Sequence, residues 1–172
     1  MLSERIKNSI KDYPDFPKKD IIFKDISPLI SDPELFSDLI QKIIKYPFFK
    51  TTDAIIAIDA RGFIFGSAVA ISLKKPLILA RKKNKLPGLV MQRTYGLEYG
   101  NDSLALQESA IAPYEKFVIV DDLLATGGTA KCVIDMLKSK NKEILALSVI
   151  IELTFLEGAK NLDIPVFSEV QY

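Results

Sequence analysis

Residues 117–137 read FVIVDDLLATGGTAKCVIDML, and this stretch decides the fold. Its apolar, β-branched beginning predicts a buried strand at Lys116–Val120, which ends in two adjacent acids, Asp121 and Asp122. A short loop of glycine and threonine follows, and the helical spacing of apolar residues predicts a helix over Gly128–Ser139. In open parallel sheets, ligands bind beyond the carboxyl ends of the strands, so this loop is the candidate site.

Short apolar strands alternate with helices on either side of this stretch. Strands are expected at 53–58, 76–80 and 144–151, and a helix at 65–73. The alternation predicts an α/β domain whose central, mainly parallel sheet has helices flanking both faces. A length of 172 residues suits one domain, 1–172, without a linker or internal repeat.

The first fifty residues show two amphipathic helical patterns separated by a proline-rich segment. The first helix is expected at Glu4–Tyr13 and the second at Pro33–Tyr46, with Ser31 or Asp32 as its N-cap. The apolar face of the second helix would contain Leu35, Leu39, Ile43 and Phe36. Three prolines exclude a continuous helix over 14–30 and indicate an extended, packed segment.

Residues 81–103 form a long polar stretch, RKKNKLPGLVMQRTYGLEYGNDS, with one proline and three glycines. A loop of this length inside a compact domain is usually functional or mobile. A strand is expected to begin or continue at Leu104–Gln107, where the chain leaves the loop. The alternative is a solvated loop without a role in function.

Composition excludes several classes of function. Lysine and arginine (23) nearly balance aspartate and glutamate (22), so no global field directs the chain to nucleic acid or an anionic membrane. The polar N-terminus is not a secretory signal, and no apolar run approaches the roughly 20 residues of a membrane span. A single cysteine, Cys132, excludes an internal disulfide and fits a reducing compartment, so a cytoplasmic location is expected. Without histidine, acid–base chemistry needs a carboxylate, tyrosine, lysine or the substrate itself.

The loop at 125–129 has the chemistry of a phosphate site. Glycine lets backbone amides approach a phosphate closely, threonine hydroxyls add donors, and the helix N-terminus favours negative charge. The carboxylates of Asp121 and Asp122 suit the two hydroxyls of a ribose. The segment therefore predicts a ribose-phosphate site, and the plain alternative is a helix cap with a surface acid and a glycine turn.

The string VIVDDLLATGGT resembles the phosphoribosyl pyrophosphate signature of type I phosphoribosyltransferases, in the version typical of the members that use adenine. Further motifs of that family follow one another along nearly the whole chain: PDFPKKDIIFKDISPLISDP, IDARGFIFG, RKKNKLPG, YGLEYG and VFSEVQY. The resemblance implies the type I phosphoribosyltransferase fold. In that fold, about 14–30 and part of the C-terminal region would form a small hood, and 81–103 a mobile lid loop.

The resemblance also assigns roles to residues. Ribose 5-phosphate would be bound by Asp121, Asp122, Ala125, Thr126, Gly127, Gly128 and Thr129. Pyrophosphate would be bound by Asp59, Ala60, Arg61, Arg81 and Lys85. Ala60 stands where the family often has serine, and the alternative for Arg61 is a surface charge at a helix start.

In the lid, Glu98 and Tyr99 match the family's catalytic pair, and Asp121 and Asp122 join them as catalytic candidates. Glu98 would assist proton removal from the purine, a role that suits a chain without histidine. Gly96 replaces a common serine, which bears on lid dynamics more than on the type of reaction.

Four residues would bind adenine: Ile22, Phe23, Lys24 and Leu153. Phe23 and Leu153 would cover the two ring faces, and the backbone beside Phe23 would read the polar edge, although Lys24 replaces a usual arginine. In relatives that use 6-oxopurines, an aspartate of the phosphate loop faces N7–H, whereas Ala125 suits the bare N7 acceptor of adenine. Core packing of Phe23 and Leu153 is the alternative.

The implied reaction joins adenine to phosphoribosyl pyrophosphate and gives AMP and pyrophosphate, a step of purine salvage. Mg²⁺ would bind mainly through the pyrophosphate, the ribose hydroxyls and water, so no protein-only metal site is expected. The resemblance also implies a homodimer. One alternative function is a phosphoribosyltransferase for another purine, and Ala125 argues against it. The other is a purine-responsive regulator, which would need a basic DNA-binding module that the chain does not show.

Overall fold

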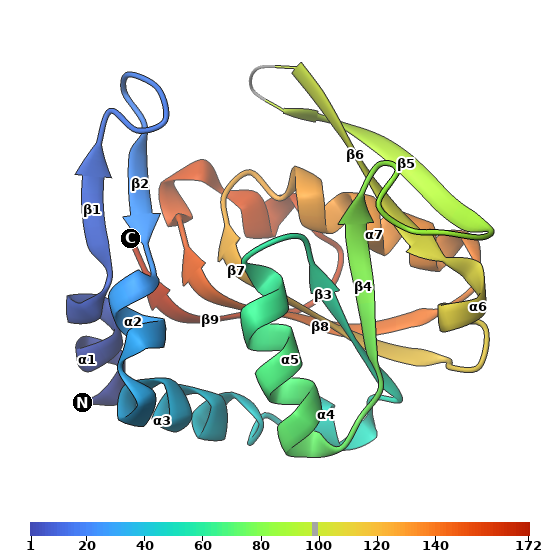
Figure 1. Ribbon diagram of the computed structural model, residues 1–172, viewed down its shortest axis with the longest axis horizontal. Coiled ribbons are helices and arrows are strands. Elements are labelled where there is room, and N and C mark those ends of the chain that lie inside the picture. The colour runs from blue at the N-terminus through green and yellow to red at the C-terminus, as the bar shows by residue number, and fades with distance from the viewer. Residues whose placement is uncertain (98–99) are drawn as a thin grey trace. The chain divides into compact units, whose positions relative to one another are not determined.

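The computed structural model describes residues 1–97 and 100–172. The chain divides into two compact units, Met1–Lys45 and Tyr46–Tyr172, and each is described by itself (Figure 1). None of the helices that the structure describes is long and apolar enough to span a bilayer.

The first unit combines short helices with a two-stranded antiparallel sheet. Its elements are α1 (Leu2–Ser9), β1 (Lys11–Pro14), β2 (Ile22–Asp25), α2 (Ser27–Ser31) and α3 (Pro33–Ile43). The prediction of a first helix reaching Tyr13 was wrong, because residues 11–14 pair with residues 22–25 instead. Asp32 caps α3, as expected, by accepting a hydrogen bond from the Leu35 amide. The predicted extended segment does form β2, but it also contains the one-turn helix α2.

The second unit has a seven-stranded sheet in the order β5-β6-β4-β3-β7-β8-β9. Its strands are β3 (Ala54–Ile58), β4 (Leu77–Lys82), β5 (Val90–Leu97), β6 (Gly100–Gln107), β7 (Lys116–Leu124), β8 (Glu143–Glu152) and β9 (Val166–Gln171). The five strands from β4 to β9 in that order pair in parallel, and β6 is antiparallel to β4 and β5. The predicted mainly parallel sheet is confirmed.

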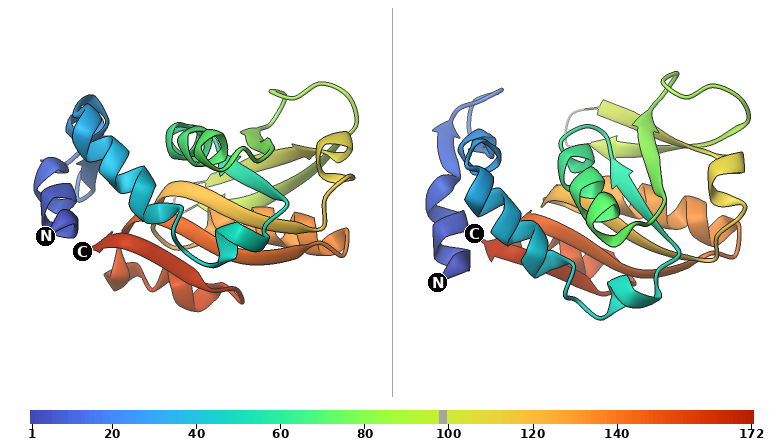
Figure 2. Two further views of the ribbon diagram at one scale, coloured as in Figure 1. Left: turned by 90° about the horizontal axis from the view of Figure 1, so that it is seen from below. Right: turned by 60° about the horizontal axis from the view of Figure 1, so that its bottom comes forward.

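Helices cover both faces of this sheet. Helix α5 (Gly62–Leu73) packs against β3 and β7, whereas α7 (Gly128–Ser139) packs against β5, β6 and β8 on the opposite face (Figure 2). The short helices α4 (Phe48–Thr51) and α6 (Glu108–Ile111) and the 3₁₀ turns η1 (Thr154–Leu156) and η2 (Gly158–Asn161) complete the unit. Right-handed crossovers in opposite directions along the sheet place α5 and α7 on opposite faces.

Two predictions about this unit were wrong in extent. Residues 81–103 are not a loop throughout, because β5 and β6 form an antiparallel hairpin from Val90 to Gln107. Strand β7 does not end before the acids but continues to Leu124, because the long strand β8 pairs with it as far as Leu124↔Glu152. Asp121 and Asp122 are therefore strand residues that belong to the last pleats of β7.

Candidate active site

The carboxyl ends of β3 and β7 lie side by side at the point where the chain changes direction along the sheet. From β3 the connection runs through α5 to β4 on one side, and from β7 it runs through α7 to β8 on the other. Such a switch point leaves a crevice between the two departing loops, which is where open α/β sheets bind ligands. The predicted pyrophosphate turn at 59–61 follows β3, and the predicted ribose-phosphate loop follows β7.

The turn after β3 contacts the end of β7 through the aspartate pair. Arg61 Nη2 lies 2.6 Å from Asp122 Oδ2 in an ion pair that is largely buried on the carboxylate side. A Cβ at Gly62 would lie 2.7 Å from Asp121 Oδ1, so only glycine allows the start of α5 to approach this close. The structure therefore brings the predicted residue Arg61, at the N-cap of α5, together with the predicted residues Asp121 and Asp122 of β7.

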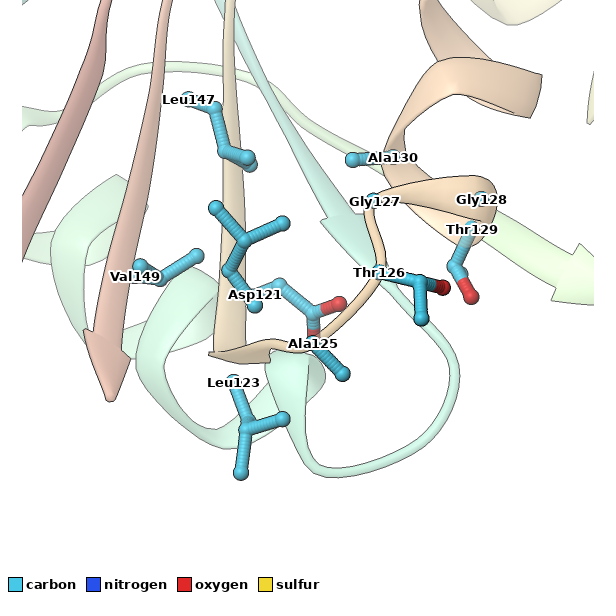
Figure 3. Close-up of a pocket in the computed structure, with 11 residues that line it drawn as sticks. Asp121, Leu123, Ala125, Thr126, Gly127, Gly128, Thr129, Ala130, Leu147 and Val149 are labelled. Carbon is cyan, nitrogen blue, oxygen red and sulfur yellow. The ribbon is translucent and has the colours of Figure 1, made fainter. Parts of the chain in front are cut away.

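A pocket of about 190 Å³ opens at the turn between β7 and α7. Figure 3 shows Asp121, Ala125, Thr126 and Thr129 around this turn, and Leu147 and Val149 of β8 also line the pocket. Gly127 has φ +87°, a conformation that favours glycine, and no side chain caps α7. The first amides of α7 are thus left for another acceptor, as in helix N-termini that bind anions.

The aspartate pair lies in an environment that opposes its charge. Burial raises the pKa of the Asp121 carboxyl well above its ordinary value, and the neighbouring Asp122 carboxylate raises it further. Burial also raises the pKa of Asp122, although the Arg61 guanidinium acts in the opposite direction. A ligand that donates hydrogen bonds or carries developing positive charge would stabilise the ionised form of these carboxyl groups.

A second cluster surrounds Asp59, at the end of β3. Arg81 Nε lies 3.4 Å from Asp59 Oδ2, and the Lys82 amide donates to the same oxygen at 3.3 Å. Arg81 Nη1 also donates to the Lys85 carbonyl, and its guanidinium lies 5.9 Å from the centre of the Phe63 ring. The peptide bond between Asp59 and Ala60 is cis. Of the predicted pyrophosphate residues, Asp59, Arg81 and Lys85 thus form one connected group, to which Lys85 contributes its backbone carbonyl, whereas Arg61 pairs with Asp122.

Strand β5 of the hairpin is attached to α7 next to the phosphate loop through residues in its middle and outer part. Tyr95 shares a side-chain hydrogen bond with Thr129, the Cys132 thiol donates to the Arg93 carbonyl at 3.4 Å, and Arg93 pairs with Asp135 at 3.2 Å. The segment 81–103, predicted to be the lid, is therefore held beside the pocket by contacts within it, at Arg93 and Tyr95. Glu98 and Tyr99, the predicted catalytic pair, lie outside the described residues.

The predicted adenine residues are divided between the two units. In the first unit, Phe16 packs edge-on against Phe23 at 5.2 Å between ring centres, and buried Lys24 lies 2.7 Å from Asp12 Oδ1. Ile22 is exposed. In the second unit, half-buried Leu153 donates its amide to the Leu124 carbonyl at 2.9 Å, which holds it beside the end of β7. The common adenine site of these residues stays a prediction.

Comparisons with known proteins agree with this geometry. A family model described as the phosphoribosyl transferase domain matches residues 34–166. The adenine phosphoribosyltransferase of Prochlorococcus marinus strain MIT 9215 is 50% identical over 172 residues, all of both chains. The chain belongs to the adenine phosphoribosyltransferase family.

Solved structures of this family share the whole fold. The crystal structure of adenine phosphoribosyltransferase from Thermoanaerobacter pseudethanolicus has a TM-score of 0.93 at 40% identity, with 99% of each chain covered. The Saccharomyces cerevisiae adenine phosphoribosyltransferase, solved with adenine and an imino-altritol bisphosphate, has a TM-score of 0.92 at 34% identity and 98% coverage of each chain. The predicted family is thereby confirmed.

Three residues that contact the candidate site were not predicted from the sequence. Gly62 lies within the motif IDARGFIFG, but its contact with Asp121 depends on the distance between the start of α5 and β7. Gly158 and Asn161 of η2 contact the loop 125–127 from 31 or more residues away in the chain. A glycine and an asparagine between short turns are also common loop residues, so the local pattern carries no signal for this role.

Proposed function

We propose that the pocket at the β7–α7 turn binds the ribose 5-phosphate part of phosphoribosyl pyrophosphate. As an adenine phosphoribosyltransferase, the enzyme transfers that group to adenine and forms AMP and pyrophosphate, a purine-salvage reaction. This assignment is supported by three kinds of group around one cavity of about 190 Å³. They are the uncapped amides of α7, the hydroxyls of Thr126 and Thr129, and the carboxylate of Asp121. The amides and the threonine hydroxyls are hydrogen-bond donors for a phosphate, and the carboxylate is an acceptor for ribose hydroxyls.

In the proposed mechanism, N9 of adenine forms a bond to C1′ of the ribose while the bond from C1′ to the pyrophosphate oxygen breaks. The sugar passes through an oxocarbenium-like state, whose positive charge the neighbouring carboxylates of Asp121 and Asp122 stabilise. Negative charge develops at the same time on the leaving pyrophosphate. The cations proposed to offset it are Arg61, at the start of α5, and Arg81, near the end of β4. The proton of N9 passes to a base, for which we propose Glu98.

The proposed preference for adenine over other purines rests on the residues that would face the base. Ala125 lines the pocket without a charge, so no anion repels the N7 acceptor of adenine. The relatives named above are adenine phosphoribosyltransferases, and that of Saccharomyces cerevisiae was solved with adenine. We propose that Phe23 and Leu153 cover the ring and that the backbone beside Phe23 reads its edge. Lys24 pairs with Asp12, which fits recognition by its backbone rather than by its side chain.

Mg²⁺ is the proposed cofactor, held mainly by the pyrophosphate and ribose oxygens of the substrate and by water. The site fits this arrangement, because the Asp121 carboxylate lines the pocket where the ribose hydroxyls would lie. When bound, the ion neutralises charge on the leaving pyrophosphate. No group of three or more metal-ligating side chains occurs within residues 1–97 and 100–172.

We further propose a homodimer and a cytoplasmic location. Helix α5 is apolar on its outer face as well, where Ile71 is 81% exposed and Ile64 37% exposed. Exposed apolar side chains on one helix are suited to contact with a second copy of the chain. The only cysteine, Cys132, is a buried free thiol, which fits a reducing compartment.

The assignment of the pocket is tested by comparing AMP with adenosine, which lacks only the phosphate. We expect AMP to bind much more tightly than adenosine, and Thr129→Val to weaken AMP about tenfold while leaving adenosine unchanged, since it removes one hydrogen bond to a charged group. Isothermal titration of both ligands measures the effect. Equal affinity of the wild-type enzyme for the two ligands would show that the phosphate is not bound, and an unchanged affinity of Thr129→Val for AMP would show that it does not bind at this pocket.

A further inference from the structure

The turn η2 packs directly against the loop 125–127. The side chain of Asn161 donates through Nδ2 to the carbonyl oxygen of Thr126 at 3.0 Å. A Cβ at Gly158 would collide with the Ala125 carbonyl oxygen and would lie 3.0 Å from the Gly127 nitrogen. Conversely, a Cβ at Gly127 would lie 2.8 Å from the Gly158 carbonyl oxygen. Two glycines thus let these segments approach, and Asn161 links them by a directed hydrogen bond.

This hydrogen bond sets the orientation of one peptide group. The Thr126 carbonyl and the Gly127 amide belong to the same planar trans peptide, in which C=O and N–H point in opposite directions. Because Asn161 holds the carbonyl, the Gly127 N–H faces away from Asn161. Gly127 is itself one of the residues that line the pocket.

The backbone alone does not select this orientation. Gly127 has φ +87°, and glycine populates positive and negative φ about equally. A peptide group next to glycine can therefore rotate at little cost unless a contact fixes its carbonyl. Asn161 supplies such a contact from outside the loop, at an exposed position where it has no packing role in the core.

We propose that Asn161 is a positioning residue for substrate binding: it fixes the Thr126–Gly127 peptide so that the Gly127 N–H donates to the 5′-phosphate. The proposal rests on the proposed function, because it needs the phosphate to bind in the β7–α7 pocket. Asn161 acts through the loop and does not itself touch the reacting atoms.

The experiment compares Asn161→Ala and Asn161→Asp with the wild-type enzyme. Both variants lose the donor, and Asn161→Asp keeps the shape of the side chain. We expect the Kd of AMP to rise about tenfold, as for the loss of one hydrogen bond to a charged group, with the Kd of adenosine and the melting temperature unchanged. In ¹H–¹⁵N spectra, the downfield shift of the Gly127 amide on AMP binding should be lost in both variants.

A matched control separates this effect from charge. Lys160→Gln, on the neighbouring residue, makes the net charge more negative by one, which is the same change as in Asn161→Asp. Lys160 pairs with Glu157 and not with the loop. Lys160→Gln should bind AMP like the wild-type enzyme.

The outcomes are distinguishable. If the wild-type enzyme prefers AMP to adenosine but both Asn161 variants keep that preference and the Gly127 shift, Asn161 has no positioning role. Equal weakening of AMP and adenosine would likewise overturn the proposal, because a general structural change would then be the cause. If the wild-type enzyme itself shows no preference for AMP, the proposed phosphate site is wrong and the inference is wrong with it.

Discussion

Asp121→Asn is expected to stabilise the folded enzyme and at the same time to reduce its activity strongly. The Asp121 carboxyl is buried next to Asp122, and its pKa lies well above the ordinary value. Without ligand, an ionised group at this position destabilises the fold, so a neutral isostere removes the penalty. With substrate, the same change removes a charged partner of a ribose hydroxyl, worth roughly 1.5–3 kcal/mol, so kcat/KM should fall at least about tenfold.

The stability effect has a defined dependence on pH. A carboxyl whose pKa is raised in the folded state contributes full stability below its unfolded pKa of about 3.9 and loses it as pH rises through the folded pKa. The melting temperature of Asp121→Asn should therefore equal that of the wild-type enzyme near pH 4 and exceed it increasingly toward neutral pH. Thermal unfolding without ligand, from pH 4 to 8, measures the difference.

Asp53→Asn provides a control of opposite sign just before β3. The Asp53 carboxylate accepts hydrogen bonds from the backbone amides of Lys116 and Glu115, which lower its pKa. Its stabilising contribution is present above the unfolded pKa and is lost as pH falls through the folded pKa. Asp53→Asn should thus be less stable than wild type at neutral pH and keep full activity. An Asp121→Asn variant that lost both stability and activity would contradict our account of the aspartate pair.

Glu98→Gln is expected to lower kcat by about a hundredfold or more, the effect of removing a general acid–base group. The variant keeps the shape of the side chain, so the affinities for adenine and phosphoribosyl pyrophosphate should change little if Glu98 acts in the transition state. Glu98→Leu should be worse, since it also loses hydrogen bonding. The reason for the prediction is that the chain has no histidine and that YGLEYG resembles the catalytic lid of the family.

Rapid-quench kinetics of a single turnover measure the chemical step apart from product release. Glu108→Gln is the control, because Glu108 lies at the far end of β6 and pairs with Lys140. Hydrogen exchange over 81–103, with and without substrate, tests lid closure separately from chemistry. A fully active Glu98→Gln would remove this carboxylate from the mechanism, and unchanged protection would contradict the lid.

Local signals in the sequence predicted the parts of the fold that form locally. The strand at 116–120, the glycine–threonine loop and the helix at 128–139 were all correct in type, because apolar period and helix-start residues act within one element. The strand expected at Leu104–Gln107 is the second half of β6. Strand β5 was missed because VMQRTYGL has no clear alternation, and its strand form depends on pairing with 100–107. Strand β7 was cut short for the same reason, since its last residues are held by β8.

The same distinction applies to the candidate site. Asp121 and the residues 125–129 were predicted as one group because they follow one another in the chain, and they do line one pocket. The ion pair between Arg61 and Asp122 and the hydrogen bond from Asn161 to Thr126 join segments from different parts of the sheet. Such contacts depend on strand order and register, which a single sequence does not specify.

The most direct test of the central claim is turnover with phosphoribosyl pyrophosphate, Mg²⁺ and either adenine or hypoxanthine as the base. We expect AMP and pyrophosphate in equal amounts from adenine. The kcat/KM for hypoxanthine should be lower by about a hundredfold or more, because two mispaired groups on the base each cost ~1–3 kcal/mol. Comparable turnover of hypoxanthine, or no AMP from adenine, would contradict the account.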